Sequence, residues 1–171
     1  AEYGFQGFIA ALNLLTLSST GNISDQKTYT LTAGEETIDL SNMNLGSADV
    51  NLVASWMQRP EVSAAVEAVA IGGNPIGSEG GATLLETIKT SKLKTIDIGK
   101  PLPLQEPYES DNLDLSDTKM DPGHVLLLSW WLTTEFSAAL TKIDIRGADI
   151  DEEVFAGLKR VAPEGCEVVR K

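Results

Sequence analysis

The sequence predicts an α/β solenoid, with a curved parallel sheet on the concave side and helices on the convex side. Two observations lead to this fold class: apolar spacing that alternates between strand-like and helix-like, and an internal duplication. A single strand–helix unit of this size cannot bury its own apolar face, so it must stack on similar units. We therefore expect one continuous hydrophobic interior shared by neighbouring units.

The alternation is clearest between residues 69 and 98. Val69 and Ile71 are two residues apart and share one face of a strand. Gly and Pro residues at 72–75 then end that strand. Helical spacing follows at Leu84, Leu85 and Ile88, and strand spacing returns at Ile96 and Ile98. This segment is one strand–turn–helix unit.

The duplication has nearly constant spacing. Residues 36–57 match residues 111–132 with an offset of 75, and residues 62–76 match residues 136–150 with an offset of 74. We predict a single domain over residues 1–171, with a partial unit at 1–35 and tandem units at about 36–110 and 111–171. Because the chain begins in the middle of a unit, we expect it to be either a fragment of a longer array or a processed protein.

The remaining elements follow from the same spacing. Strands are expected at residues 38–40, 69–71, 96–98, 113–115, 143–145 and 167–169. The proline-rich segment 99–112 cannot hold a regular helix and is expected to return as an extended loop. A helix carrying Phe5, Phe8, Ile9 and Leu12, a strand at 15–17 and a loop at 18–35 complete the N-terminal part.

The unit at 69–84 carries a recognisable pattern of the form LxLxxNxIxxxGxxxL. The matching residues are Val69, Ile71, Asn74, Ile76, Gly80 or Gly81, and Leu84. This pattern resembles leucine-rich repeat proteins of the ribonuclease-inhibitor-like type. The resemblance implies that the Asn74 side chain bonds turn backbone, and that the concave face binds other proteins.

Acidic residues occupy the outward centre of four predicted strands. These residues are Asp39, Asp97, Asp114 and Asp144. If the strands stack in chain order, the last three form a carboxylate row, because neighbouring strands lie about 4.8 Å apart. The row is either a site for a basic partner or a set of solvated acids. Arg146 lies on the same face and is expected to neutralise Asp144 locally.

The tryptophans are expected to have different roles. Trp56 and Trp131 occupy equivalent inward positions and are predicted to be core residues. Trp130 corresponds to Ser55 and should lie beside the inward-facing residues of its helix. It is expected either to contact a partner laterally or to be partly buried against the next unit. His124, the single histidine, is expected to be a solvated residue at a helix start.

Composition excludes several function classes. The net charge of −12 disfavours nucleic acid and anionic membranes, and no apolar run is long enough to span a bilayer. The single cysteine, Cys166, allows no internal disulfide and predicts an intracellular, cytoplasmic location, with an organelle lumen as the open alternative. No zinc ligand set, catalytic triad or phosphate loop is present, so no metal, cofactor or catalytic residue is predicted.

These observations predict a non-catalytic protein–protein interaction or assembly module. Its partner is expected to be a basic protein or a larger assembly. The candidate partner-binding residues are Asp39, Asp97, Asp114, Asp144, Arg146 and Trp130. The resemblance implies an alternative, a regulator of an enzyme of the GTPase-activating or nuclease-inhibiting kind.

Overall fold

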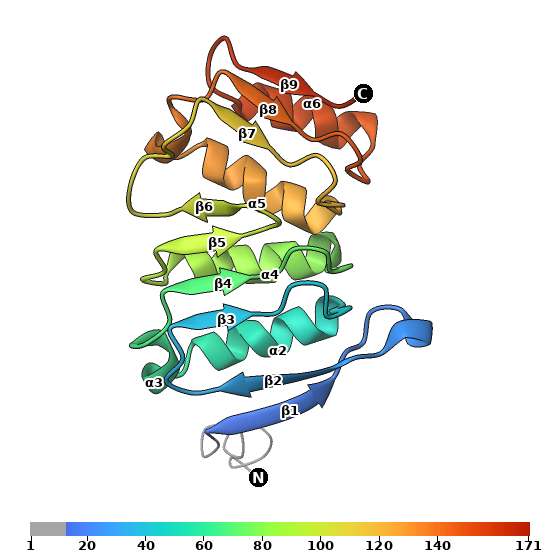
Figure 1. Ribbon diagram of the computed structural model, residues 1–171, viewed down its shortest axis with the longest axis vertical. Coiled ribbons are helices and arrows are strands. Elements are labelled where there is room, and N and C mark those ends of the chain that lie inside the picture. The colour runs from blue at the N-terminus through green and yellow to red at the C-terminus, as the bar shows by residue number, and fades with distance from the viewer. Residues whose placement is uncertain (1–12) are drawn as a thin grey trace.

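The computed structural model describes residues 13–171, which form one layer of strands backed by one layer of helices (Figure 1). The strands are β1 Leu14–Ser18, β2 Thr28–Thr32, β3 Thr37–Asp39, β4 Ala68–Ala70, β5 Thr95–Asp97, β6 Pro101–Pro103, β7 Asn112–Asp114, β8 Lys142–Asp144 and β9 Glu167–Val169. The α-helices are α2 Ser47–Met57, α3 Pro60–Ser63, α4 Gly77–Lys89, α5 Pro122–Leu132 and α6 Glu152–Val161. Two 3-10 turns are η1 Ile23–Asp25 and η2 Glu135–Ser137.

The strands belong to three separate sheets, so the predicted solenoid with one continuous, curved parallel sheet is wrong. β1 and β2 form an antiparallel pair, and β3, β4, β5 and β6 form a four-stranded sheet. β7, β8 and β9 form a three-stranded parallel sheet. The protein is therefore a small mixed α/β domain, and Ile96 and Leu113, expected side by side, lie in different sheets.

The division between the second and third sheets is explained by β6. This strand was expected to be a loop, but it runs antiparallel to β5, with Leu102 opposite Ile96. The Ile98 N–H donates to the Lys100 carbonyl oxygen, and the Leu104 N–H donates to the Lys94 carbonyl oxygen. In this segment, the backbone N–H and C=O groups of the even-numbered residues therefore point towards β5. The edge that faces away from β5 therefore carries Pro101 and Pro103, which have no N–H to donate. The sheet ends at this edge.

The N-terminal part of the described chain is a hairpin rather than a strand followed by a loop. The strand expected at residues 15–17 is present within β1, but it pairs antiparallel with β2, which lies in the predicted loop. The predicted helix carrying Phe5, Phe8, Ile9 and Leu12 falls outside the described residues.

Segments that match in sequence form matching elements. Helices α2 and α5 have 11 residues each and begin at Ser47 and Pro122, which are 75 positions apart. Strands β3 and β7 show the same offset, and β4 and β8 are offset by 74. The parallel pairings of Ile38 with Val69 and of Val69 with Ile96 are as predicted.

The core lies between the strand layer and the helix layer. Trp56 and Trp131 are both fully buried in it, which confirms the prediction for these two residues. Helices α4 and α5 approach each other through glycines, since a Cβ atom on Gly81 would lie 2.6 Å from the Cα atom of Gly123. None of the helices in the described residues is long and apolar enough to cross a membrane.

Asn74 fixes two neighbouring turns, as the sequence predicted. Its Oδ1 atom accepts hydrogen bonds from the N–H groups of Met43 and Leu45, both at 3.0 Å. Its Nδ2 atom donates to the carbonyl oxygens of Leu40 at 2.8 Å and Ile71 at 2.9 Å. Because Asn74 is buried, these bonds satisfy backbone groups that water cannot reach.

His124 is fully buried, so the expectation of a solvated residue is wrong. Its Nδ1 atom accepts from the Asp121 N–H at 3.1 Å, and its Nε2 atom lies 2.9 Å from the carbonyl oxygen of Ile71. A carbonyl oxygen can only accept, so Nε2 donates a hydrogen bond to it. Asp121 Oδ2 also accepts from the Gly77 N–H at 2.8 Å. These contacts join the start of α5 to the turn after β4 and to the start of α4.

Candidate protein-binding surfaces

The predicted carboxylate row is divided between two sheets. Asp39, Ala70 and Asp97 are successive neighbours across β3, β4 and β5, but the next partner of Asp97 is Pro101. Asp114 and Asp144 are direct neighbours in the other sheet. The continuous row of Asp97, Asp114 and Asp144 is therefore not formed, because β6 lies between β5 and β7 (Figure 1).

All four predicted aspartates accept a hydrogen bond from the backbone N–H two residues later. The acceptor–donor pairs are Asp39–Ser41 at 3.0 Å, Asp97–Gly99 at 2.8 Å, Asp114–Ser116 at 2.9 Å and Asp144–Arg146 at 3.1 Å. Asp and Asn favour this arrangement because the short side chain reaches its own backbone and shapes the turn. The aspartates therefore have a structural task at the end of each strand.

Asp144 is also paired with a cation. Its side chain is buried, and the Nε atom of Arg146 lies 3.0 Å from each of its carboxylate oxygens. This hydrogen-bonded guanidinium lowers the pKa of the Asp144 carboxyl. The pKa of Asp114 is lowered mainly by the hydroxyl and backbone N–H of Ser116. The ion pair confirms the expected local neutralisation of Asp144 by Arg146.

A polar hollow of about 560 Å³ lies at the carboxyl ends of β3, β4 and β5. Its walls are the turns after β3 and β4 on one side and the loop Asp117–Lys119 on the other. Gly99 belongs to its lining and has a φ of 122° at the tight β5–β6 turn. The described residues contain no cluster of His, Cys, Asp or Glu that could hold a metal ion here or elsewhere. The polar hollow is lined by Ser41, Asn42, Gly72, Gly73, Asp97, Gly99, Asp117, Thr118 and Lys119.

A second, more apolar depression contains Trp130; we call it the Trp130 groove. It has a volume of about 260 Å³ and is lined by Ile88, Lys89, Ser91, Leu93, Leu104, Gln105, Trp130, Thr134 and Phe136. These residues come from the C-terminal ends of α4 and α5, the segments that follow them, and the segment after β6. Trp130, Leu104 and Phe136 are partly buried and pack against the core, so part of each apolar surface remains exposed.

The walls of the Trp130 groove are held by contacts with the core. Trp131, next to Trp130, donates from Nε1 to the Pro103 carbonyl oxygen at 2.8 Å. The ring of Tyr108 packs edge-on against Trp131 with 5.7 Å between ring centroids. The backbone N–H of Tyr108 donates to the Phe136 carbonyl oxygen at 2.9 Å. Burial raises the pKa of the Tyr108 hydroxyl. These contacts fix the segment after β6 against α5.

Sequence reasoning singled out Trp130 but missed Leu104 and Phe136. The duplication contained the missing signal for Phe136, since the equivalent residue in the first half is Val62, which is buried. Trp130 likewise replaces Ser55. The second half thus carries larger aromatic side chains at two equivalent positions. Leu104 gave no comparable signal, because it belongs to the segment expected to be a loop.

Comparison with known proteins adds no family. No model of a known protein family matches the chain, and no curated protein matches its sequence. The resemblance to leucine-rich repeat proteins is therefore wrong as a family assignment, in agreement with the three separate sheets.

Proposed function

We propose that this protein is a non-catalytic protein-binding module and that the Trp130 groove is its main contact surface. The observation that carries the proposal is the exposure of aromatic surface in a concave, well-supported site. Protein interfaces are enriched in aromatic residues, and Trp is among the commonest residues of high binding energy. The Nε1 atom of Trp130 has no hydrogen-bond partner within residues 13–171, which leaves one donor for a partner.

The sheet face is a weaker candidate for the contact. Its carboxylates already accept hydrogen bonds from their own turns, and Asp144 is paired with Arg146. A partner would have to compete with these bonds, and exposed ion pairs add little affinity in water. We therefore assign Asp39, Asp97, Asp114, Asp144 and Arg146 mainly to turn formation.

The titratable groups with displaced pKa values also have structural tasks, which supports a non-catalytic role. Burial raises the pKa of the Asp121 carboxyl, but interactions with His124 and the hydrogen bonds that the carboxylate accepts from the backbone N–H groups of Gly77 and His124 outweigh burial and lower it. Asp49 and Asp144 have lowered pKa values for comparable reasons of hydrogen bonding. Structural hydrogen bonds and ion pairs also displace pKa values, so these shifts do not by themselves indicate a catalytic site. The single cysteine, Cys166, supports an intracellular compartment for the protein.

The proposal is tested by making the groove resemble the equivalent surface of the first half. The double variant Trp130→Ser/Phe136→Val carries the residues found at Ser55 and Val62. We expect it to retain at least tenfold less of the proteins that co-purify with the wild type from its native cells, because truncated interface aromatics often cost about 2 kcal/mol or more.

A matched triple variant changes the other face. Asp39→Asn, Asp97→Asn and Asp114→Asn together remove three charges but keep a side-chain oxygen that can form each turn. We expect this variant to retain its partners at wild-type levels. Loss of partners in the triple variant, with full retention in the groove variant, would overturn the proposal. Thermal unfolding of both variants checks that each one is folded.

A further inference from the structure

The Trp130 groove lies where two helices end. Helices α4 and α5 both place their C-terminal turns at it, and the carbonyl groups there carry partial negative charge. The last turn of α5 has no basic residue. The carbonyl oxygens of Trp130 and Trp131 accept hydrogen bonds from the hydroxyls of Thr133 and Thr134, which are neutral groups. The partial charge of this helix end is therefore not balanced by a cation of its own last turn.

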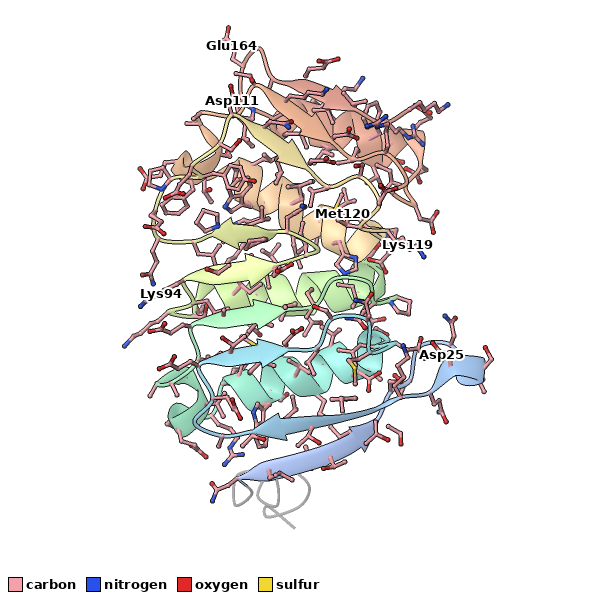
Figure 2. The ribbon with its side chains drawn as sticks, in the orientation of Figure 1. Asp25, Lys94, Asp111, Lys119, Met120 and Glu164 are labelled. Atoms are coloured by element: carbon pink, nitrogen blue, oxygen red, sulfur yellow. The ribbon has the colours of Figure 1, made fainter. Side chains whose placement is uncertain are left out.

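Acidic side chains flank the same side of the groove. Glu106 and Glu135 are exposed and adjoin lining residues Gln105 and Phe136. Between residues 101 and 141 the sequence has one cation, Lys119, which lies at the opposite edge of the molecule from Asp111 and Lys94 (Figure 2). On the α4 side, Lys89 lines the groove, and Lys92 and Lys94 adjoin the lining residues Ser91 and Leu93. The Nζ atom of Lys89 is paired with Glu86 at 3.4 Å, and the Nζ atom of Lys94 is paired with Glu67 at 2.9 Å and also interacts with the charge of Glu106.

The size and lining of the groove suit a side chain of a protein. Its volume of about 260 Å³ lies below the roughly 300–1,000 Å³ of small-molecule sites. The buried residues Ile88 and Leu93 also line it, together with the partly exposed Leu104, Trp130 and Phe136. One apolar side chain can contact this surface while its neighbours reach the rim.

We propose that the Trp130 groove binds a cationic peptide segment of a partner protein, with one apolar anchor residue in the groove and Lys or Arg residues beside it. The cations would face Glu106, Glu135 and the end of α5. An Arg side chain could also stack on the part of the Trp130 ring that is exposed. This inference rests on the proposed function and adds the chemistry of the partner.

A random 12-residue peptide display library, selected on the wild-type protein, tests the inference. Each recovered sequence is measured again on Trp130→Ser/Phe136→Val by fluorescence polarisation. Some sequences should bind the double variant at least tenfold more weakly than the wild type. We expect most of these sequences to carry both an apolar residue and an excess of Lys and Arg. Their affinity should fall as salt is raised.

Charge variants separate local attraction from the general charge of −12. Glu106→Lys/Glu135→Lys should weaken the recovered peptides about fivefold or more, because like charges now meet at the groove. Glu153→Lys/Glu164→Lys changes the net charge equally but far from the groove, with Glu164 at the C-terminal end (Figure 2). This control pair should leave affinity within about twofold, the effect expected of distant charges in physiological salt.

The possible failures are distinguishable. Sequences that depend on Trp130 and Phe136 but lack an excess of Lys and Arg would overturn the cationic partner and leave the proposed function standing. Equal weakening by the two charge pairs would likewise show that attraction is not local to the groove. Recovery of no sequence that depends on Trp130 and Phe136 would overturn both the inference and the proposed contact surface.

Discussion

Replacing Asp49 by alanine should loosen the β1–β2 hairpin from helix α2. The Asp49 carboxylate is buried and accepts hydrogen bonds from the N–H and the hydroxyl of Thr20, both at 2.6 Å. It also accepts from the Tyr29 hydroxyl at 2.7 Å and from the Gly46 N–H at 3.0 Å. Thr20 and Tyr29 belong to the hairpin region and Gly46 is the N-cap of α2, so one side chain joins the two parts.

The magnitude follows from the donors that lose their acceptor. Thr20 is exposed and can turn to water, whereas Tyr29 and Gly46 are buried. Leaving a buried donor unsatisfied costs about 1–3 kcal/mol, so Asp49→Ala should lower the free energy of unfolding by about 2–6 kcal/mol. For a chain of this size each kcal/mol corresponds to about 2–4 °C, which gives a fall in Tm of roughly 10 °C.

Urea unfolding followed by circular dichroism measures the loss. Asp151→Ala is a suitable control, because Asp151 also serves a helix start but makes one exposed bond, to the Val154 N–H at 2.8 Å. Its loss should be about 1 kcal/mol, typical of a helix cap. If Asp49→Ala costs no more than Asp151→Ala, the carboxylate does not hold the hairpin and the reasoning is refuted.

The same carboxylate gives stability a pH dependence. Burial raises the pKa of Asp49, but hydrogen bonds from Thr20, Tyr29 and the Gly46 N–H outweigh burial and lower it overall. The folded pKa then lies below the unfolded pKa, so the contribution is complete above the unfolded value and is lost as the pH falls through the folded one. The urea midpoint of the wild type should therefore fall more steeply below about pH 4 than that of Asp49→Asn.

Three further changes test other parts of the structure. Asn74→Ala removes a buried side chain that bonds two turns and should cost about 2–5 kcal/mol in urea unfolding, with no rescue by Asp, which cannot donate. Gly81→Ala should destabilise by about 1–3 kcal/mol through overpacking of α4 on α5, whereas Gly157→Ala, with open space in α6, should stabilise by about 0.5–1 kcal/mol. Arg146→Ala should raise the pKa of Asp144 towards its ordinary value in a carboxyl ¹³C NMR titration. An unchanged pKa would contradict the role of Arg146, and equal effects of the two glycine variants would contradict the close contact of α4 with α5.

The local elements could be predicted from the sequence because their signals are local. Strand alternation, helical spacing and the constant offset placed β3–β5, β7–β9 and helix α4. The grouping into sheets depends on which edge of a strand faces which neighbour. Pro101 and Pro103 have the spacing that empties one edge of donors, but the sequence does not show which edge. The break between β6 and β7 depends on which edge of β6 lacks N–H donors.

The candidate site could be predicted only in part, for a related reason. The sequence placed the four Asp residues on the outward side of their strands by alternation; Asp39 and Asp114 are exposed, Asp97 is half-buried and Asp144 is buried. Whether the carboxylate oxygens remain free depends on the backbone that follows, and here each Asp bonds the N–H two residues later. Trp130 was found because its equivalent is Ser55, whereas Leu104 enters the groove only because β6 folds back along β5.

The way in which α4 and α5 are joined bears directly on binding. The two helices meet at Gly81 and Gly123, and Asp121 and His124 tie the start of α5 to the starting turn of α4 and to the turn after β4. With their beginnings fixed in this way, the ends of the two helices, which form the groove walls, have little freedom to move apart. A partner that enters a preformed groove loses less free energy to ordering of the site, so a small apolar contact can still contribute measurable affinity. Weakening the α4–α5 contact with Gly81→Ala should therefore reduce the affinity of groove-binding peptides even under conditions where the variant remains folded, although the substituted residue lies outside the groove.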